Sequence, residues 1–229
     1  MTSPAVKLLK RLLITIDGPA GSGKTTISRA LAERLGYRTV DTGALYRGVA
    51  LAVSLHGVAP DDLEGLKDLC QRLELSFVQE DDGLHLHLDG RDVTEQIRSP
   101  EITMLASAVS SQPVVRDCLL RLQRRLGDAR AAVFEGRDMG TVVFPQADVK
   151  FFLTADLSTR ARRRFAELGG GSGPSLEKVT ADMAQRDHND SARDVAPLRP
   201  ADDAIHIDST HLDIDAVIDE MMGHIRRLS

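Results

Sequence analysis

The chain has 229 residues, which suits a single globular domain with room for a buried core. Apolar residues make up 42% and charged residues 28%, a balance that excludes a disordered or fibrous chain. The formal net charge of −5 argues against a general nucleic-acid binder, because such proteins gather positive charge on one face. Two cysteines exclude a disulfide framework and a multi-cysteine zinc site.

The first apolar run, Leu12–Ile16, follows basic residues and stops at Asp17. It is too short for a signal-peptide core or a membrane span. We therefore expect a soluble protein of the reducing cytoplasm.

Short, apolar, β-branched runs alternate with segments whose apolar residues recur at helical spacing. The predicted strands are Leu12–Ile16, Arg38–Val40, Ala131–Phe134, Val149–Leu153 and Ala204–Ile207. The predicted helices begin with Ile27–Leu35, which Gly36 caps, and continue with Leu45–Leu55, Leu63–Leu73, Val114–Leu126, Thr159–Leu168, Leu176–Asp190 and Ile214–Leu228. This alternation predicts an α/β fold in which helices cover both faces of a parallel sheet.

Two stretches depart from that alternation. Residues Leu75–Val93 predict a small β-rich insert, with turns at Asp82-Gly83 and Asp89-Gly90. The run Gly169–Gly173 separates two charged helices, and so many glycines predict a mobile flap.

Residues Gly18–Thr25 fit the pattern G-x-x-x-x-G-K-[ST] of a phosphate-binding loop, or P-loop. Glycines let backbone N–H groups surround an anion, and the helix that follows directs its positive end at the phosphates. Lys24 can bridge the outer phosphates, and the Thr25 hydroxyl can bind Mg²⁺. A plain glycine-rich turn with an exposed lysine is the alternative, but the strand–loop–helix context favours nucleoside-triphosphate binding.

The P-loop alone does not distinguish kinases from other nucleotide-binding proteins. A GTPase would carry an Asn-Lys-x-Asp motif, which this sequence lacks, and motor or transport ATPases are usually longer. A compact chain with an arginine-rich flap favours a small-molecule kinase.

Arginines flank the glycine-rich run at helical spacing. One set is Arg160, Arg163 and Arg164, and the other is Arg186 and Arg193 with Asp190 between them. Phosphoryl transfer needs such dispersed positive charge. The alternative is a pair of solvated helices in which Asp190 forms intrahelical ion pairs with Arg186 and Arg193.

Polar clusters follow two of the predicted strands, at Asp41–Arg47 and Glu135–Thr141. Ligands of open α/β sheets bind beyond the carboxyl ends of the strands. Either cluster alone would pass for an ordinary loop, but together they predict an acceptor pocket.

Five segments together resemble the bacterial cytidylate (CMP/dCMP) kinase family, and the match runs nearly end to end. These segments are Ile16–Lys24, Asp41–Arg47, Gly136–Pro145, Val195–Leu198 and Asp208–Thr210. The resemblance implies a P-loop fold with a five-stranded parallel sheet covered by helices on both faces. It also implies one kinase domain over residues 1–229, with an acceptor-binding insert at 60–104 and a helical lid at 158–194.

The family implies transfer of the γ-phosphoryl group of ATP to CMP or dCMP, with UMP a poor acceptor and Mg²⁺ required. It further implies a monomer that acts on small molecules and needs neither nucleic acid nor a membrane. Two alternatives remain at this point: a related kinase for UMP, AMP or shikimate, and a non-catalytic module gated by nucleotide.

Carried over by position, the resemblance assigns roles to individual residues. The residues assigned to ATP binding are Gly18, Pro19, Ala20, Gly21, Ser22, Gly23, Lys24, Thr25, Thr26, Arg160 and Arg163. Thr25 is also assigned as the metal ligand. The residues assigned to binding the acceptor nucleotide are Thr42, Tyr46, Arg47, Ser107, Arg116, Arg137, Asp138, Arg186, Asp190 and Arg193. The catalytic charges are Lys24, Arg137, Arg186, Arg160 and Arg164. Glu135 stands where an aspartate is common, which leaves its role open.

Within the acceptor set, Ser107, Arg116 and Asp138 match the positions that read cytosine. A carboxylate accepts from the N4 amino group, while arginine and serine donate to N3 and O2. Arg47, Arg137 and Arg186 match the holders of the acceptor phosphate, and Asp190 matches the ribose contact. The nucleophile would be a phosphate oxygen that is already ionised, so no protein base is needed.

Three further features have simpler interpretations. His85 and His87 share one strand face, but a closed metal site needs more ligands, so a solvated face is expected. Cys70 and Cys118 are expected to be small buried apolar residues. The basic run Arg162–Arg164 is a weak RNA signal in an acidic chain.

Overall fold

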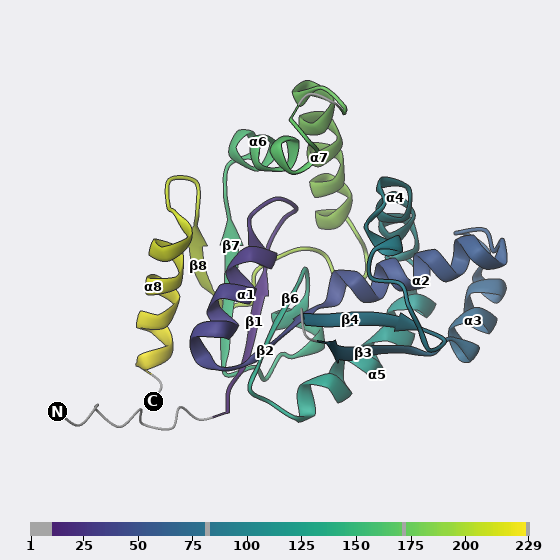
Figure 1. Cartoon of the computed structure of the whole chain (residues 1–229), viewed down its shortest axis with the longest axis horizontal. Helices are drawn as coiled ribbons and strands as arrows, with labels where there is room; N and C mark the ends of the chain where they lie inside the picture. The colour runs from purple at the N-terminus through teal and green to yellow at the C-terminus, as the bar shows by residue number, and fades with distance from the viewer. Residues whose placement is uncertain (1–10, 81–82, 171–172, 228–229) are drawn as a thin grey trace.

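The structure is a computed structural model that describes residues 11–80, 83–170 and 173–227. Its main sheet is parallel throughout and confirms the predicted α/β class (Figure 1). In spatial order the strands are β2 (Arg38–Asp41), β6 (Ala132–Gly136), β1 (Leu13–Asp17), β7 (Val149–Thr154) and β8 (Ile205–Asp208). Because Asp17 pairs with Gly136, the loops that follow β1 and β6 leave the sheet side by side.

Helices cover both faces of this sheet. On one face, Ile14, Phe151 and Ile207 pack with apolar residues of α1 (Lys24–Leu35) and α8 (Ile214–Arg226). On the other face, Phe134 packs with residues of α5 (Pro113–Asp128) and of the short π-helix η2 (Met139–Val143). Burial on both sides explains why the strands are near-continuous apolar runs.

A second group of elements lies to the right of the main sheet in Figure 1 and has its own apolar core. Its helices are α2 (Thr42–His56), α3 (Leu63–Arg72), the 3₁₀ turn η1 (Gln96–Arg98) and α4 (Pro100–Val109). Its antiparallel sheet consists of β3 (Leu75–Glu80), β4 (Gly83–Leu88) and β5 (Arg91–Asp92). The predicted β-structure over Leu75–Val93 is therefore present.

The two predicted turns of this sheet differ in how far the structure describes them. Asp82 of the first turn lies outside the described residues. In the second turn, Asp89 and Gly90 have φ values of 49° and 78°. Positive φ at both central residues is typical of a tight β-hairpin.

Helix α4 was not predicted, although its start carries a recognisable signal. The Ser99 hydroxyl accepts a hydrogen bond from the Ile102 backbone N–H at 3.2 Å, and Pro100 occupies the first helical turn. Both residues are favoured at a helix N-terminus.

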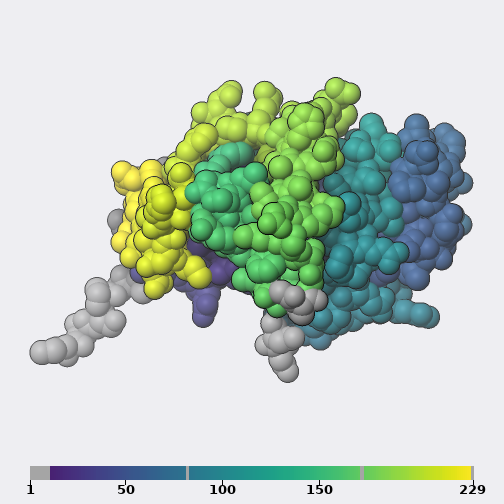
Figure 2. All heavy atoms as spheres, turned by 90° about the horizontal axis from the view of Figure 1, so that it is seen from above, coloured from purple at the N-terminus to yellow at the C-terminus, as the bar shows by residue number. Residues whose placement is uncertain are grey.

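Two helices, α6 (Leu157–Glu167) and α7 (Leu176–Ser191), form a pair above the sheet (Figure 1). Ala161, Val179 and Met183 form a small core between them, and Ala20 of the P-loop packs against it. Seen from above in Figure 2, this pair lies between the yellow α8 and the blue and teal α2–α4 group. Gly171 and Ser172 of the predicted flap lie outside the described residues.

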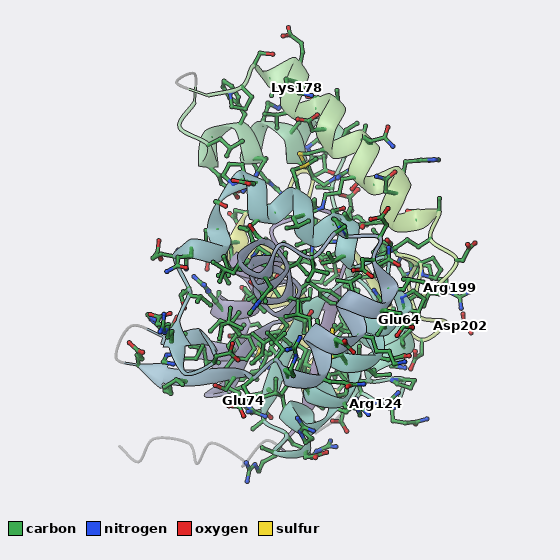
Figure 3. All side chains as sticks on the ribbon, turned by 90° about the vertical axis from the view of Figure 1, so that its right-hand side faces the viewer. Glu64, Glu74, Arg124, Lys178, Arg199 and Asp202 are labelled. Carbon is green, nitrogen blue, oxygen red and sulfur yellow. The ribbon has the colours of Figure 1, made fainter. Side chains whose placement is uncertain are left out.

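Figure 3 gives the same arrangement from the side: Lys178, near the start of α7, stands at the top, and Glu74 and Arg124 lie at the opposite end of the molecule. Within the described ranges, no helix combines the length and the apolar character that crossing a membrane requires.

Candidate active site

The P-loop connects β1 to α1 through glycines with positive φ: 153° at Gly18, 71° at Gly21 and 90° at Gly23. A Cβ on Gly18 would lie 2.0 Å from the Leu153 carbonyl oxygen, so the loop needs glycine there for space as well as conformation. Lys24, the first residue of α1, is buried, and its Nζ donates to the Pro19 carbonyl at 2.7 Å. Burial and the charges of Arg137 and Arg186 lower the pKa of Lys24.

Thr25 and Glu135 join the P-loop helix to the end of β6. The Thr25 hydroxyl donates to Glu135 Oε2 at 3.0 Å, while Glu135 Oε1 is buried without a hydrogen-bond partner among the described residues. Burial and the charge of Asp41 raise the pKa of Glu135 to about 7. A hydroxyl and a carboxylate with one unpartnered oxygen are hard donors, and they fit Mg²⁺. Thr26 follows in the first turn of α1 and is exposed.

The loop after β6 is held by a residue that the sequence did not single out. Asp17, at the end of β1, accepts hydrogen bonds from the Met139 and Gly140 backbone N–H groups at 2.8 and 2.7 Å. Burial raises its pKa to about 6, partly offset by those two bonds. Asp17 thereby fixes η2, and with it the two consecutive residues that precede η2, Arg137 and Asp138.

Asp138 forms a buried ion pair with Arg116 of α5. Burial raises the pKa of Asp138 against the opposing effect of Arg116. The Arg116 guanidinium also lies 5.6 Å from the ring centroid of Tyr46, a cation–π contact. These three residues line a cavity of about 60 Å³.

A second charged group centres on Asp190 of α7. Arg137 Nε donates to Asp190 Oδ2 at 3.0 Å, and Arg193 Nη2 lies 3.6 Å from Asp190 Oδ1. Within the described ranges, the buried Nε atom of Arg186 has no hydrogen-bond partner, and neither has Nη2 of Arg193. Burial and the charge of Arg137 lower the pKa of Arg186 to about 10. This cluster therefore has more positive charge than Asp190 neutralises.

The alternative, intrahelical pairing around Asp190, is only partly found. Arg193 does contact Asp190, but the shortest contact of that carboxylate comes from Arg137, 53 residues earlier in the chain. The alternative of two merely solvated helices therefore does not describe this face.

The arginines of α6 point in different directions. Arg160 is buried and donates through Nη1 to the Ala20 carbonyl at 3.0 Å and to Asp187 Oδ2 at 2.6 Å. Arg163 donates to the Ser209 carbonyl at 2.7 Å. Arg164 instead forms a partly exposed pair with Glu167 at 2.9 Å. The structure therefore brings Arg160 to the P-loop and leaves Arg164 in a surface ion pair.

The remaining predicted residues lie on helices α2 and α4 of the second group of elements. Thr42 is buried and donates to the Glu135 carbonyl at 2.7 Å, and Arg47 pairs with Asp41 at 2.7 Å. Ser107 lies partly buried in α4. A cavity of about 460 Å³ opens beside this group, and Asp41, Arg47 and Glu135 are among its lining residues.

Comparison with known proteins gives a consistent result over nearly the whole chain. Residues 14–227 match the family model described as "Cytidylate kinase". The chain is 51% identical to a cytidylate kinase of Geobacter sulfurreducens over 216 residues, covering 94% of this chain and 93% of the relative. It is 46% identical to a cytidylate kinase of Pseudomonas fluorescens, covering 95% of this chain and 96% of that relative.

Among solved structures, an uncharacterized protein from Eubacterium ventriosum has a similar fold, with a TM-score of 0.51 and 15% sequence identity. The alignment covers 95% of this chain and 99% of that protein. At that identity the likeness concerns the fold alone.

Proposed function

The chain belongs to the cytidylate kinase family, and from that premise we propose that it transfers the γ-phosphoryl group of ATP to CMP or dCMP, giving CDP or dCDP and ADP. The observation that carries this proposal is the buried Arg116–Asp138 pair, which lies in the same strand-end region as the P-loop. A fixed donor and a fixed acceptor suit the N3, O2 and N4 edge of cytosine.

We assign residues 60–104 to an acceptor-binding insert and residues 158–194 to a lid, both within one kinase domain over 1–229. The small apolar core between α6 and α7 supports the lid assignment, and the insert packs in an apolar core that it shares with α2 and α5.

On the donor side, the P-loop amides and Lys24 would hold the outer phosphates of ATP. The present bond from Lys24 to Pro19 would be exchanged for one to phosphate oxygen, a stronger charge-assisted bond. Arg160 and Arg163 lie beside the loop, and Arg164 would join them only by leaving Glu167.

Thr25 and Glu135 are the residues that would hold Mg²⁺. When bound, the ion supplies positive charge to the phosphate oxygens. Ionisation of Glu135, whose pKa is about 7, would accompany that binding.

On the acceptor side, Asp138, Arg116 and Ser107 would read the base, with Tyr46 supporting Arg116. The phosphate of CMP would lie among Arg47, Arg137 and Arg186, and the ribose would lie beside Asp190. Thr42 positions the end of β6 through its bond to Glu135, and Arg193 adds charge near Asp190.

In this account the protein transfers no proton at the reacting oxygen. The acceptor phosphate attacks as an anion, and the arginines with Lys24 stabilise the charge spread over the phosphoryl oxygens. These side chains, held in fixed positions, take the place of the water that would otherwise solvate that charge.

A steady-state assay of ADP release tests the assignment with CMP, dCMP, UMP, AMP and shikimate as acceptors. We expect turnover with CMP and dCMP, weak turnover with UMP, and none with AMP or shikimate. Highest turnover with AMP or shikimate would favour a related kinase. Binding of ATP with no acceptor-dependent turnover would favour a nucleotide-gated module.

A further inference from the structure

The antiparallel sheet of the insert carries a cluster of four metal-ligating side chains. His85 and His87 lie on one face of β4, Glu80 ends β3 and Asp92 lies on β5. The strand pairing places them together, because His87 pairs with Asp92 and alternate residues of β4 share one face. In Figure 1 this sheet lies to the right of β1.

The ligand atoms of Glu80, His85 and Asp92 all lie within 4.8 Å of one another, and His87 joins this group through its contact with Glu80. His85 Nδ1 lies 2.9 Å from Asp92 Oδ2 and 3.7 Å from Glu80 Oε2. His87 Nε2 lies 3.5 Å from Glu80 Oε1. In a tetrahedral zinc site with bonds near 2.0–2.1 Å, neighbouring ligand atoms are about 3.3 Å apart. The three observed separations bracket that spacing.

Hydrogen bonds alone leave part of this cluster unsatisfied. Nε2 of His87 is buried and has no hydrogen-bond partner in the described part of the chain. Asp92, by contrast, is already oriented, because its Oδ1 accepts from the Thr94 backbone N–H at 2.8 Å while Oδ2 faces His85. Such outer bonds to a ligating carboxylate are a regular feature of metal sites.

We propose that Glu80, His85, His87 and Asp92 bind one divalent transition-metal ion of the Zn²⁺ class. Two imidazoles with two carboxylates suit zinc, nickel or copper, whereas Mg²⁺ prefers an all-oxygen set such as Thr25 and Glu135. The four side chains come from three strands, so the bound ion would hold β3, β4 and β5 together. His85 also lines the 460 Å³ cavity that Asp41 and Arg47 share, so the ion would steady one wall of that cavity.

Cobalt titration of the full chain tests the proposal. The protein, purified without a histidine tag and stripped with chelator, is titrated with CoCl₂ in buffer free of Mg²⁺ and nucleotide. We expect the visible absorption of tetrahedral Co²⁺ to saturate at one equivalent, and ZnCl₂ to abolish it. Zn²⁺ should also raise the melting temperature, since an ion that binds only the folded chain stabilises it.

Two variants and a control locate the site. His87→Gln and Asp92→Asn should each weaken Co²⁺ binding by about 10–100-fold or more, because even outer-shell substitutions cost that much. His56→Gln, an exposed histidine at the end of α2, should bind as the wild type does. Melting curves without metal check that each variant folds. One folded variant is enough to test whether the site binds the ion.

The proposal is overturned if the wild-type chain gives no saturable tetrahedral spectrum. It is equally overturned if binding persists unchanged in a folded His87→Gln or Asp92→Asn variant.

Discussion

The guanidinium of Arg116 and the carboxylate of Asp138 face each other in the interior, with 8% and 4% of their side chains exposed. Burying two opposite charges costs desolvation free energy that their attraction repays only in part, so the pair is weak evidence for stability and fits a role in binding. In our account they hold a fixed pattern of donors and an acceptor for cytosine.

Asp138→Asn should change the choice of base more than the rate of transfer. The amide can present a donor to the O4 atom of UMP, whereas the carboxylate can only accept from the N4 amino group of CMP. We expect the ratio of kcat/KM for CMP over UMP to fall by on the order of 10–100-fold. Asp68→Ala, an exposed position on α3, is the control and should keep the wild-type ratio. An unchanged ratio in Asp138→Asn would remove Asp138 from base recognition.

Lys24→Ala should lower kcat by on the order of 10²–10⁴, as expected for a lost charge-stabilising group. The folded protein should not suffer, because Lys24 is buried near Arg137 and Arg186, whose charges lower its pKa. Melting temperature and kcat measured together separate the two effects. Lys67→Ala, in an exposed pair with Glu64, should leave both unchanged. A Lys24→Ala protein that melts early and keeps its kcat would reverse this assignment.

Glu135 should make the nucleotide-free protein less stable as pH rises. Its pKa is raised from 4.5 to about 7, so between these values the folded chain holds a proton that the unfolded chain has lost. The stabilisation is complete below pH 4.5 and disappears as pH passes 7. Asp17, raised from 3.8 to about 6, adds a similar slope at lower pH.

Glu135→Gln isolates that contribution. The melting temperature, measured from pH 5 to 8.5 without Mg²⁺, should fall less steeply with pH in this variant than in the wild type. Glu64→Gln, at an exposed position on α3, should keep the wild-type slope. If the melting temperatures of Glu135→Gln and the wild type fell equally with pH, the pKa of Glu135 would not be raised in the folded protein.

Gly18→Ala should disrupt the P-loop. The added Cβ would lie 2.0 Å from the Leu153 carbonyl oxygen, and φ is 153° there. We expect a lower melting temperature and loss of ATP binding measured by calorimetry. Gly223→Ala in α8 is the matched control: apart from the local helix backbone, no atom of the described residues lies within 4 Å of the added Cβ, so it should stabilise the helix by about 0.5–1 kcal/mol. Wild-type ATP affinity in Gly18→Ala would contradict the close approach.

The strand–loop–helix unit was predictable because its signals are local. Leu12–Ile16 was predicted and Leu13–Asp17 forms, and Gly36, predicted as a cap, ends α1 with a φ of 66°. Helix α4 was missed because its Ser-Pro start was not weighed, and η2 because a single π-turn leaves no periodic pattern.

Spacing and the family resemblance named the candidate site residues, but not the contacts that these residues make. Spacing placed Asp190 on one face with Arg186 and Arg193, yet its nearest partner, Arg137, comes from the loop that follows β6. Spacing likewise grouped Arg164 with Arg160, whereas Arg164 pairs with Glu167. Asp17 and Glu135 were undervalued because a carboxylate that accepts from a distant backbone or hydroxyl group has no local sequence signal.

Quantifying both products of one reaction tests the central claim most directly. The purified chain is incubated with ATP, CMP and Mg²⁺, and CDP and ADP are measured by chromatography over time. The account predicts that CDP and ADP appear in equal amounts and that omission of CMP stops ADP formation. Release of ADP without CDP, or no consumption of ATP in the presence of CMP, would contradict it.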